Sequence, residues 1–232
     1  MDLDGLSPAK FSTGTDTAQR YLAGAYDSIN ALLQTLDTVR DARKTMQGDI
    51  RGRLPESEAD LLRAAVVFTG AGLDASLKQV IRDALPALLE TNRQAHIKFE
   101  TFASDRIGLG GEMAEAKIVA RYLTSPNPRV RLIEDYVYDL TGSSLQSADE
   151  VQRTAGALGI DDGTLRKRIT GLKDLFVARN EISHELDLQR PERQGDRSRR
   201  TRQMKSTVKL CHEGLEVGQL VLNEVAVLLN TG

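Results

Sequence analysis

The sequence predicts an all-α protein, and three features of its 232 residues indicate this. Apolar side chains recur every three or four positions along most of the chain, which is the spacing of one face of a helix. The alternation of apolar and polar residues that is typical of strands is almost absent. Prolines, glycines and capping residues separate the periodic stretches. With no tryptophan and 4% aromatic residues, the core must consist mostly of leucine, valine, isoleucine and alanine.

The first periodic stretch predicts a helix that ends at about Gln47. It begins after Thr15 or Thr17, because threonine is suited to cap the start of a helix. Its apolar face repeats at intervals of three and four, and its members are Tyr21, Leu22, Ala25, Ile29, Leu32, Leu33, Leu36 and Val39.

A second helix is predicted to start near Pro55 and to extend to about residue 90. Proline suits the first turn of a helix, where its missing N–H is not needed. Gly70 and Gly72 either bend this helix or let another backbone come close. Pro86 lies inside the pattern, so we expect it to kink or end the helix.

The middle of the chain is more irregular. Residues 108–112 read as a loop and residues 125–128 as a turn, with shorter helices at about 113–123 and 128–140. Residues 147–160 predict a small helix that stops at a glycine.

The rest of the chain continues the helical pattern. Asp161 or Asp162 caps a long helix that extends to about Asp187. A basic loop (188–205) follows, and a last helix is expected at about 200–229. We expect one domain over residues 1–232, in which residues 108–160 form a helical insertion or second lobe.

Composition excludes several classes of protein. The N-terminus resembles no signal peptide, and no run reaches the roughly 18 apolar residues that a membrane span needs. Cys211 is the sole cysteine, so an internal disulfide and a thiolate zinc site are excluded, and we expect it to be buried. These features predict a soluble, cytoplasmic protein that has no membrane contact and no metal site.

The net charge is −2, but one segment is strongly basic. Between Arg190 and Lys205 there are seven basic and two acidic residues, a local balance of +5. The basic residues are Arg190, Arg193, Arg197, Arg199, Arg200, Arg202 and Lys205. This segment is either a solvated loop or a surface that binds the phosphates of RNA.

An arginine interrupts the apolar stripe of the long helix before this segment. The other members of the stripe are Leu165, Ile169, Leu172, Leu175, Phe176, Ile182 and Leu186. Arg179 takes a position that its neighbours seven residues away give to leucine. Because a buried guanidinium is costly unless it is paired, Arg179 needs a carboxylate, a subunit interface or the phosphate of a ligand.

His184 lies about 140° round the helix from Arg179. Asn180 lies one turn before His184 and shares its face. Phosphodiester chemistry uses such groups, since a histidine transfers protons and an arginine stabilises charge on phosphate. No metal or cofactor is required. The alternative is a buried pair of Arg179 with a carboxylate and a histidine that faces only solvent.

The six residues Arg179-Asn180-Glu181-Ile182-Ser183-His184 resemble the R-x4–6-H motif of HEPN domains. These are small α-helical domains, many of them ribonucleases of toxin–antitoxin, anti-phage and CRISPR systems. Their motif lies in a late helix, usually with a polar residue directly after the arginine. Residues 72–90 resemble the second helix of the family, and the RiboL-PSP type of HEPN domain is the most similar.

The resemblance implies an HEPN-like helical bundle with additional middle helices, and a metal-independent endoribonuclease of prokaryotic defence or toxicity. Arg179 and His184 would be the catalytic pair, with Asn180 as a polar assistant and Ser183 in a supporting place. Family members usually form homodimers that join two motifs in one cleft, and they leave RNA with a 2′,3′-cyclic phosphate. An antitoxin or regulatory protein is a further candidate partner.

Asp74 and Lys78 are one turn apart on the earlier helix. They are candidates to orient Arg179 or to bind phosphate, or else they form a plain surface pair. The tyrosine that many HEPN toxins carry two residues after the histidine is Leu186 here. This departure argues against a nucleotidyltransferase partner. The alternative function is a non-catalytic helical module that binds a partner protein or nucleic acid.

Other polar residues have plainer explanations. His96 and His212 lack further ligands at metal spacing, so we expect them to pack or face solvent. Tyr136 and Tyr138 point apart on a helix, so at least one belongs to the core and the other is able to stack on a base.

Overall fold

The computed structural model describes residues 3, 14–48, 52, 54–108, 116–145 and 147–231. Within these ranges the chain is helical, with only an isolated bridge between Leu188 and Arg199, so the all-α prediction is confirmed. The helices are α1 (Asp16–Gln47), α2 (Glu56–Thr91), α3 (Arg93–Arg106), α4 (Ala116–Leu123), α5 (Pro128–Thr141), α6 (Ala148–Ala157), α7 (Gly163–Gly171), α8 (Lys173–Glu185) and α9 (Met204–Thr231).

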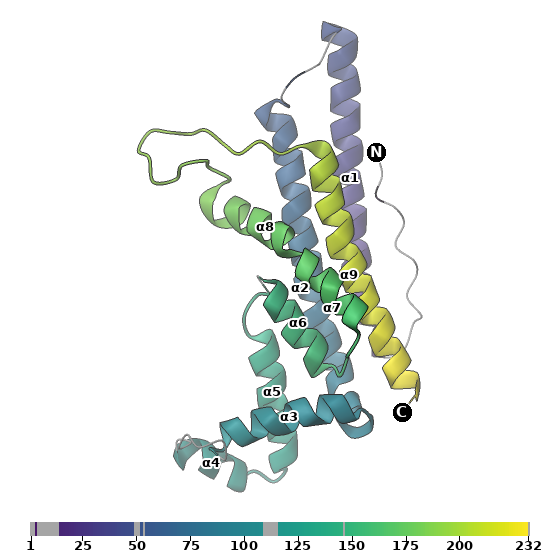
Figure 1. Cartoon of the computed structure of the whole chain (residues 1–232), viewed down its shortest axis with the longest axis vertical. Helices are drawn as coiled ribbons and strands as arrows, with labels where there is room; N and C mark the ends of the chain where they lie inside the picture. The colour runs from purple at the N-terminus through teal and green to yellow at the C-terminus, as the bar shows by residue number, and fades with distance from the viewer. Residues whose placement is uncertain are drawn as a thin grey trace.

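The three long helices α1, α2 and α9 lie side by side along the long axis of the molecule (Figure 1). Their shared core consists mainly of leucine, isoleucine and valine, as the composition requires. Gly72 of α2 faces α1, and a Cβ added there would lie 2.2 Å from the Cβ of Ala25. The predicted close approach at this glycine is confirmed, because only a hydrogen atom fits between the two helices.

Helix ends follow the sequence signals closely in this bundle. α1 begins directly after Thr15 and ends at Gln47. α2 does not end at Pro86 but continues to Thr91, so that one of the two expectations for this proline was wrong. Pro86 and Arg82 are both on the exposed side of α2, where water can bind the carbonyl that proline leaves without a donor.

The shorter helices α3, α5 and α6 pack beside the lower half of α2, and α4 packs on α5 (Figure 1). α5 and α6 match the predicted helices, and α6 stops before Gly159, which has a φ of 79°. α3 was not predicted, because it buries only Ala95 and Phe99 and so shows little apolar periodicity. The predicted 108–112 loop, apart from Gly108, and the start of a helix at Met113 lie outside the described residues.

The long helix predicted before the basic segment is two helices, which meet at Leu172. Asp162 caps α7 through bonds from the N–H groups of Thr164 (2.8 Å) and Leu165 (3.2 Å), as predicted. The N–H of Leu172 bonds to the carbonyl of Ile169 at 3.0 Å, a tighter turn than an α-helix makes.

The apolar stripe also ends earlier than predicted. The five stripe residues from Leu165 to Phe176 are buried, and Ile182 is partly buried. Leu186 is 68% exposed, because α8 stops at Glu185 and the left-handed backbone of Leu186 (φ 51°) turns its side chain away from the stripe.

Residues 186–203 form a loop that projects from the bundle between α8 and α9 (Figure 1). α9 begins at Met204, four residues later than predicted. Among the described residues, no helix is both long and apolar enough to cross a membrane.

Candidate active site

Arg179 lies in the middle of α8, where that helix packs across α2. Its aliphatic stem rests on Gly70, since a Cβ at residue 70 would lie 3.1 Å from the Cγ of Arg179. The guanidinium Nη1 donates to Oδ1 of Asn180 at 3.0 Å. Arg179 is only partly buried, and no carboxylate in the described ranges lies within ion-pair distance of it. Two features therefore allow an arginine on this stripe. Gly70 makes room for its aliphatic stem, and its guanidinium extends to the edge of the apolar core, where it is partly exposed.

His184 and Ser183 are exposed in the last turn of α8. Asn180 lies one turn before His184, so the two side chains share a face of the helix, as predicted. The structure thus places Arg179 on the side of α8 that packs against α2, partly exposed, and His184 on the exposed side of the same helix. Arg179 and His184 do not hydrogen-bond to each other, which agrees with their separation around the helix.

Asp74 and Lys78 lie further along α2 and form a pair with each other at 3.0 Å. Oδ1 of Asp74 also accepts a bond from the N–H of Leu145 at 2.7 Å, which ties the segment before α6 to α2. Asp74 is one turn beyond Gly70 and so on the same side of α2. Neither residue bonds to Arg179, and the observed role of Asp74 is to hold the chain at Leu145.

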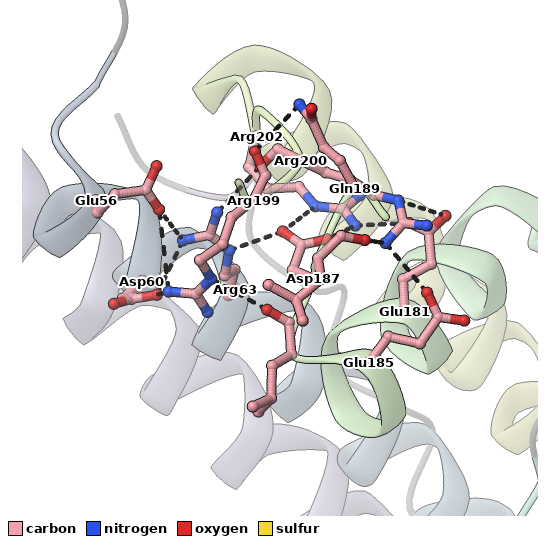
Figure 2. Close-up of polar contacts among 12 residues, drawn as sticks. Glu56, Asp60, Arg63, Glu181, Glu185, Asp187, Gln189, Arg199, Arg200 and Arg202 are labelled. Carbon is pink, nitrogen blue, oxygen red and sulfur yellow. Dashed lines mark hydrogen bonds and ion pairs between the residues drawn. The ribbon is translucent and has the colours of Figure 1, made fainter. Parts of the chain in front are cut away.

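The C-terminal end of α8 meets a group of charged residues that we call the Asp187 cluster (Figure 2). Its members are Glu56, Asp60, Arg63, Glu181, Glu185, Asp187, Arg199, Arg200 and Arg202. At its centre the carboxylate of Asp187, fully buried, accepts from Nε of Arg63 at 2.7 Å and from Nε of Arg202 at 3.0 Å. Arg63 is also buried, at 2% exposure.

The rest of the cluster surrounds this centre. Arg63 contacts Asp60 at 2.9 Å and Glu56 at 3.1 Å, while Arg202 reaches Glu181 at 2.8 Å. Arg200 lies 3.2 Å from Glu181, and its backbone carbonyl accepts from Nη2 of Arg63 at 3.0 Å. The cluster thus joins α2, α8 and the loop after α8 through charge-assisted hydrogen bonds.

Two opposing effects act on the pKa of Asp187: burial and the neighbouring arginines. Burial by itself would raise the pKa of the carboxyl group. Hydrogen bonds from Arg202 and Arg63, together with the charges of both guanidinium groups, outweigh burial and lower the pKa below its ordinary value of 3.8. Asp187 is therefore ionised at neutral pH.

Ion pairs neutralise some of the basic residues between Arg190 and Lys205 and leave others exposed. Arg199 pairs with Asp60 at 2.6 Å, and Arg200 and Arg202 pair with acidic residues of α8 and its end. Arg190 lies 2.8 Å from Asp196 within the loop. Arg193, Arg197 and Lys205 are exposed, and none of the three has an ion pair with another described residue. The part of the segment that offers open positive charge is thus smaller than its composition suggests.

Arg63 and Asp187 were not singled out from the sequence, although a signal existed. Arg63 stands inside the apolar run LLRAAVV and is seven residues, about two helical turns, before Gly70. It therefore falls on the buried side of α2, just as Arg179 falls on the stripe of α8. A core-facing arginine such as Arg63 predicts a buried acidic partner, and Asp187 is that partner.

Cys211, Tyr136 and Tyr138 lie where the sequence suggested. No group of three histidine, cysteine or acidic residues in the described parts of the chain is suited to hold a metal ion. Cys211 is buried. Nδ1 of His96 lies 3.1 Å from the carbonyl oxygen of Leu89. Tyr136 is buried and packs on Phe102, whereas Tyr138 is 75% exposed.

Two cavities of about 680 and 700 Å³ lie among the shorter helices α3 to α7. Exposed Tyr138 and three arginines line the first, but acidic residues pair with two of those arginines. Neither cavity is lined by Arg179 or His184. The two catalytic candidates therefore lie outside both of these cavities.

Comparison with protein-family models, curated proteins and solved structures found no match to this chain. The resemblance of Arg179 to His184 to the HEPN motif therefore stays a prediction.

Proposed function

We propose that this protein is a metal-independent endoribonuclease whose catalytic groups are Arg179 and His184, with Asn180 as an assistant. One observation carries the proposal: the Arg179 guanidinium sits on a core-facing stripe without a carboxylate partner among the described residues. A part-buried cation without a counter-charge is suited to a phosphate. The imidazole of His184 is exposed on the same helix, where it can transfer protons.

In the proposed reaction the RNA supplies its own nucleophile. An unprotonated His184 accepts the proton of a ribose 2′-hydroxyl, and the 2′-oxygen forms a bond to the adjacent phosphorus. The bond from phosphorus to the 5′-oxygen breaks, and a protonated imidazole donates a proton to that leaving oxygen. Arg179 holds the phosphate and stabilises the charge that develops on it. The products are a 2′,3′-cyclic phosphate and a free 5′-hydroxyl.

Two imidazoles meet these opposite requirements more readily than one. We therefore place the reaction between two copies of the chain, with the exposed edge of α8 facing its counterpart. The exposure of His184 and Ser183 in the single chain supports a homodimer of this kind. The exposed arginines of the loop, Arg193 and Arg197, would then contact the RNA backbone beside the cleft.

The decisive experiment is cleavage of total RNA and transfer RNA in EDTA by the wild type and by His184→Ala. His96→Ala is the matched control, because it removes an imidazole far from α8. We expect the wild type and the control to cut RNA to cyclic-phosphate ends, and His184→Ala and Arg179→Ala to lose at least a hundredfold in rate. Equal cutting by His184→Ala would refute the assignment of His184. No cutting by any form would favour the helical binding module instead.

A further inference from the structure

The candidate motif on α8 is held from its C-terminal side. Glu181, which lies between Arg179 and His184 in sequence, receives Arg202 at 2.8 Å and Arg200 at 3.2 Å. The backbone carbonyl of Glu181 accepts the N–H of Asp187 at 2.9 Å. These three contacts join the turn of helix that carries His184 to the chain that follows it.

The backbone directly after His184 adopts an unfavourable conformation. Leu186 and Asp187 have φ values of 51° and 61°, in the left-handed region that residues other than glycine rarely occupy. Two such residues in succession persist only when their surroundings hold them there. Here the Asp187 carboxylate accepts hydrogen bonds from Arg63 of α2 and from Arg202 of the loop. The Asp187 carbonyl also accepts the N–H of Arg200 at 2.8 Å.

Both catalytic candidates are therefore held in place by α2. The stem of Arg179 rests on Gly70 of α2. The turn of His184 is joined to Arg63 of α2 through Asp187, which follows the histidine by three residues. Asp187 therefore connects the end of α8 directly to α2, in addition to the packing around the middle of α8.

We propose that Arg63, Asp187 and Arg202 are positioning residues, which fix the orientation of His184 relative to Arg179. This inference rests on the proposed function. It also assigns two different roles to the arginines of the basic segment. Arg202 holds α8 and does not bind RNA, whereas Arg193 and Arg197, in the exposed part of the loop, bind the RNA backbone.

Four variants separate these roles by the split between kcat and KM. Arg202→Lys keeps the positive charge but loses the planar fork that grips Asp187 and Glu181 together. Asp187→Asn removes the carboxylate without removing any positive charge. We expect both to lower kcat at least tenfold with KM within twofold. The double variant Arg193→Gln/Arg197→Gln should instead raise KM at least fivefold and weaken its salt dependence, with kcat within twofold. Arg166→Gln, which removes an exposed pair with Asp161 on α7, is the neutral control.

Amide hydrogen exchange supplies a readout that does not depend on activity. We expect Arg202→Lys to speed exchange at residues 182–188 at least tenfold, while the core of α9 exchanges as in the wild type. Equal acceleration throughout the protein in Arg202→Lys would mean that Arg202 serves global stability alone, and its positioning role would be wrong. A raised KM with unchanged kcat in Arg202→Lys would make Arg202 an RNA contact and overturn the division.

The failure of the positioning role can be told from failure of the proposed function. If His184→Ala cuts RNA as fast as the wild type, the nuclease assignment fails whatever the cluster does. If the nuclease assignment holds but Asp187→Asn and Arg202→Lys match Arg166→Gln in kcat and in exchange at residues 182–188, the positioning role alone is refuted. If no form cuts RNA, unchanged exchange at these residues in Arg202→Lys still refutes it.

Discussion

The guanidinium of Arg63 and the carboxylate of Asp187 meet at 2.7 Å inside the protein, 124 residues apart in the sequence. Both side chains are buried almost completely, at 3% and 0% exposure. Arg63 belongs to the first third of α2, and Asp187 follows the candidate motif by three residues. The pair therefore joins the central helix of the bundle to the segment that carries the proposed chemistry.

Removal of one partner from this pair should be costly. In Asp187→Ala the guanidinium of Arg63 keeps only carboxylates near the surface, and Arg202 loses its buried acceptor. A broken buried ion pair typically destabilises a protein by about 3–5 kcal/mol, and we expect a loss in this range. Urea unfolding followed by circular dichroism measures it. Arg166→Gln, which breaks an exposed pair, should change stability by less than about 1 kcal/mol; equal losses in the two variants would contradict the buried role.

Acid should weaken the fold through the same carboxylate. The pKa of Asp187 is lower in the folded protein than its ordinary value of 3.8, so the folded state holds the proton less tightly than the unfolded chain. The resulting stability is present above the unfolded pKa and is lost as pH falls through the folded pKa. Stability curves from pH 6 to 2 should show the difference between the wild type and Asp187→Asn shrinking below about pH 4. A constant difference over this range would exclude the linkage.

Gly72 and Gly24 offer a matched pair of glycine substitutions within helices. Gly72→Ala places a methyl group 2.2 Å from the Cβ of Ala25, so α1 and α2 must separate, at a cost of about 1–3 kcal/mol. Gly24 has open space around it on the exposed side of α1, and Gly24→Ala should stabilise the helix by about 0.5–1 kcal/mol. Thermal unfolding should move in opposite directions for the two variants. A stabilised Gly72→Ala protein would mean that α1 and α2 pack less closely than described.

Cys211 should be unreactive in the folded protein. Burial raises the pKa of its thiol to about 11, although a hydrogen bond with Thr69 acts in the opposite direction. The thiolate, which is the reactive form, is then scarce at pH 8 and shielded from reagents. Ellman's reagent should label the native protein very slowly and should label one thiol rapidly in urea. Rapid labelling without denaturant would show that α9 opens readily at this position.

Local sequence signals determined most of the helix ends. Asp162 and Pro55 mark helix starts because capping and proline geometry depend on the few residues around them. Thr15 stands directly before α1, although its side chain makes no capping hydrogen bond. The break at Leu172 and the exposure of Leu186 escaped prediction, because a seven-residue repeat continues through both positions. Periodicity indicates which side chains are apolar, but it does not indicate where the helix ends.

The sequence by itself determined that this protein is all-α and that Arg179 and His184 share one late helix, since both follow from spacing along the chain. Only the tertiary structure decided how the charges are used. Ion pairing is a matter of distance in space, so composition showed a basic segment, while folding paired Arg199, Arg200 and Arg202 with acids. In the same way folding placed Gly70 under Arg179 and Arg63 against Asp187, because contacts between residues far apart in sequence exist only once the helices have packed.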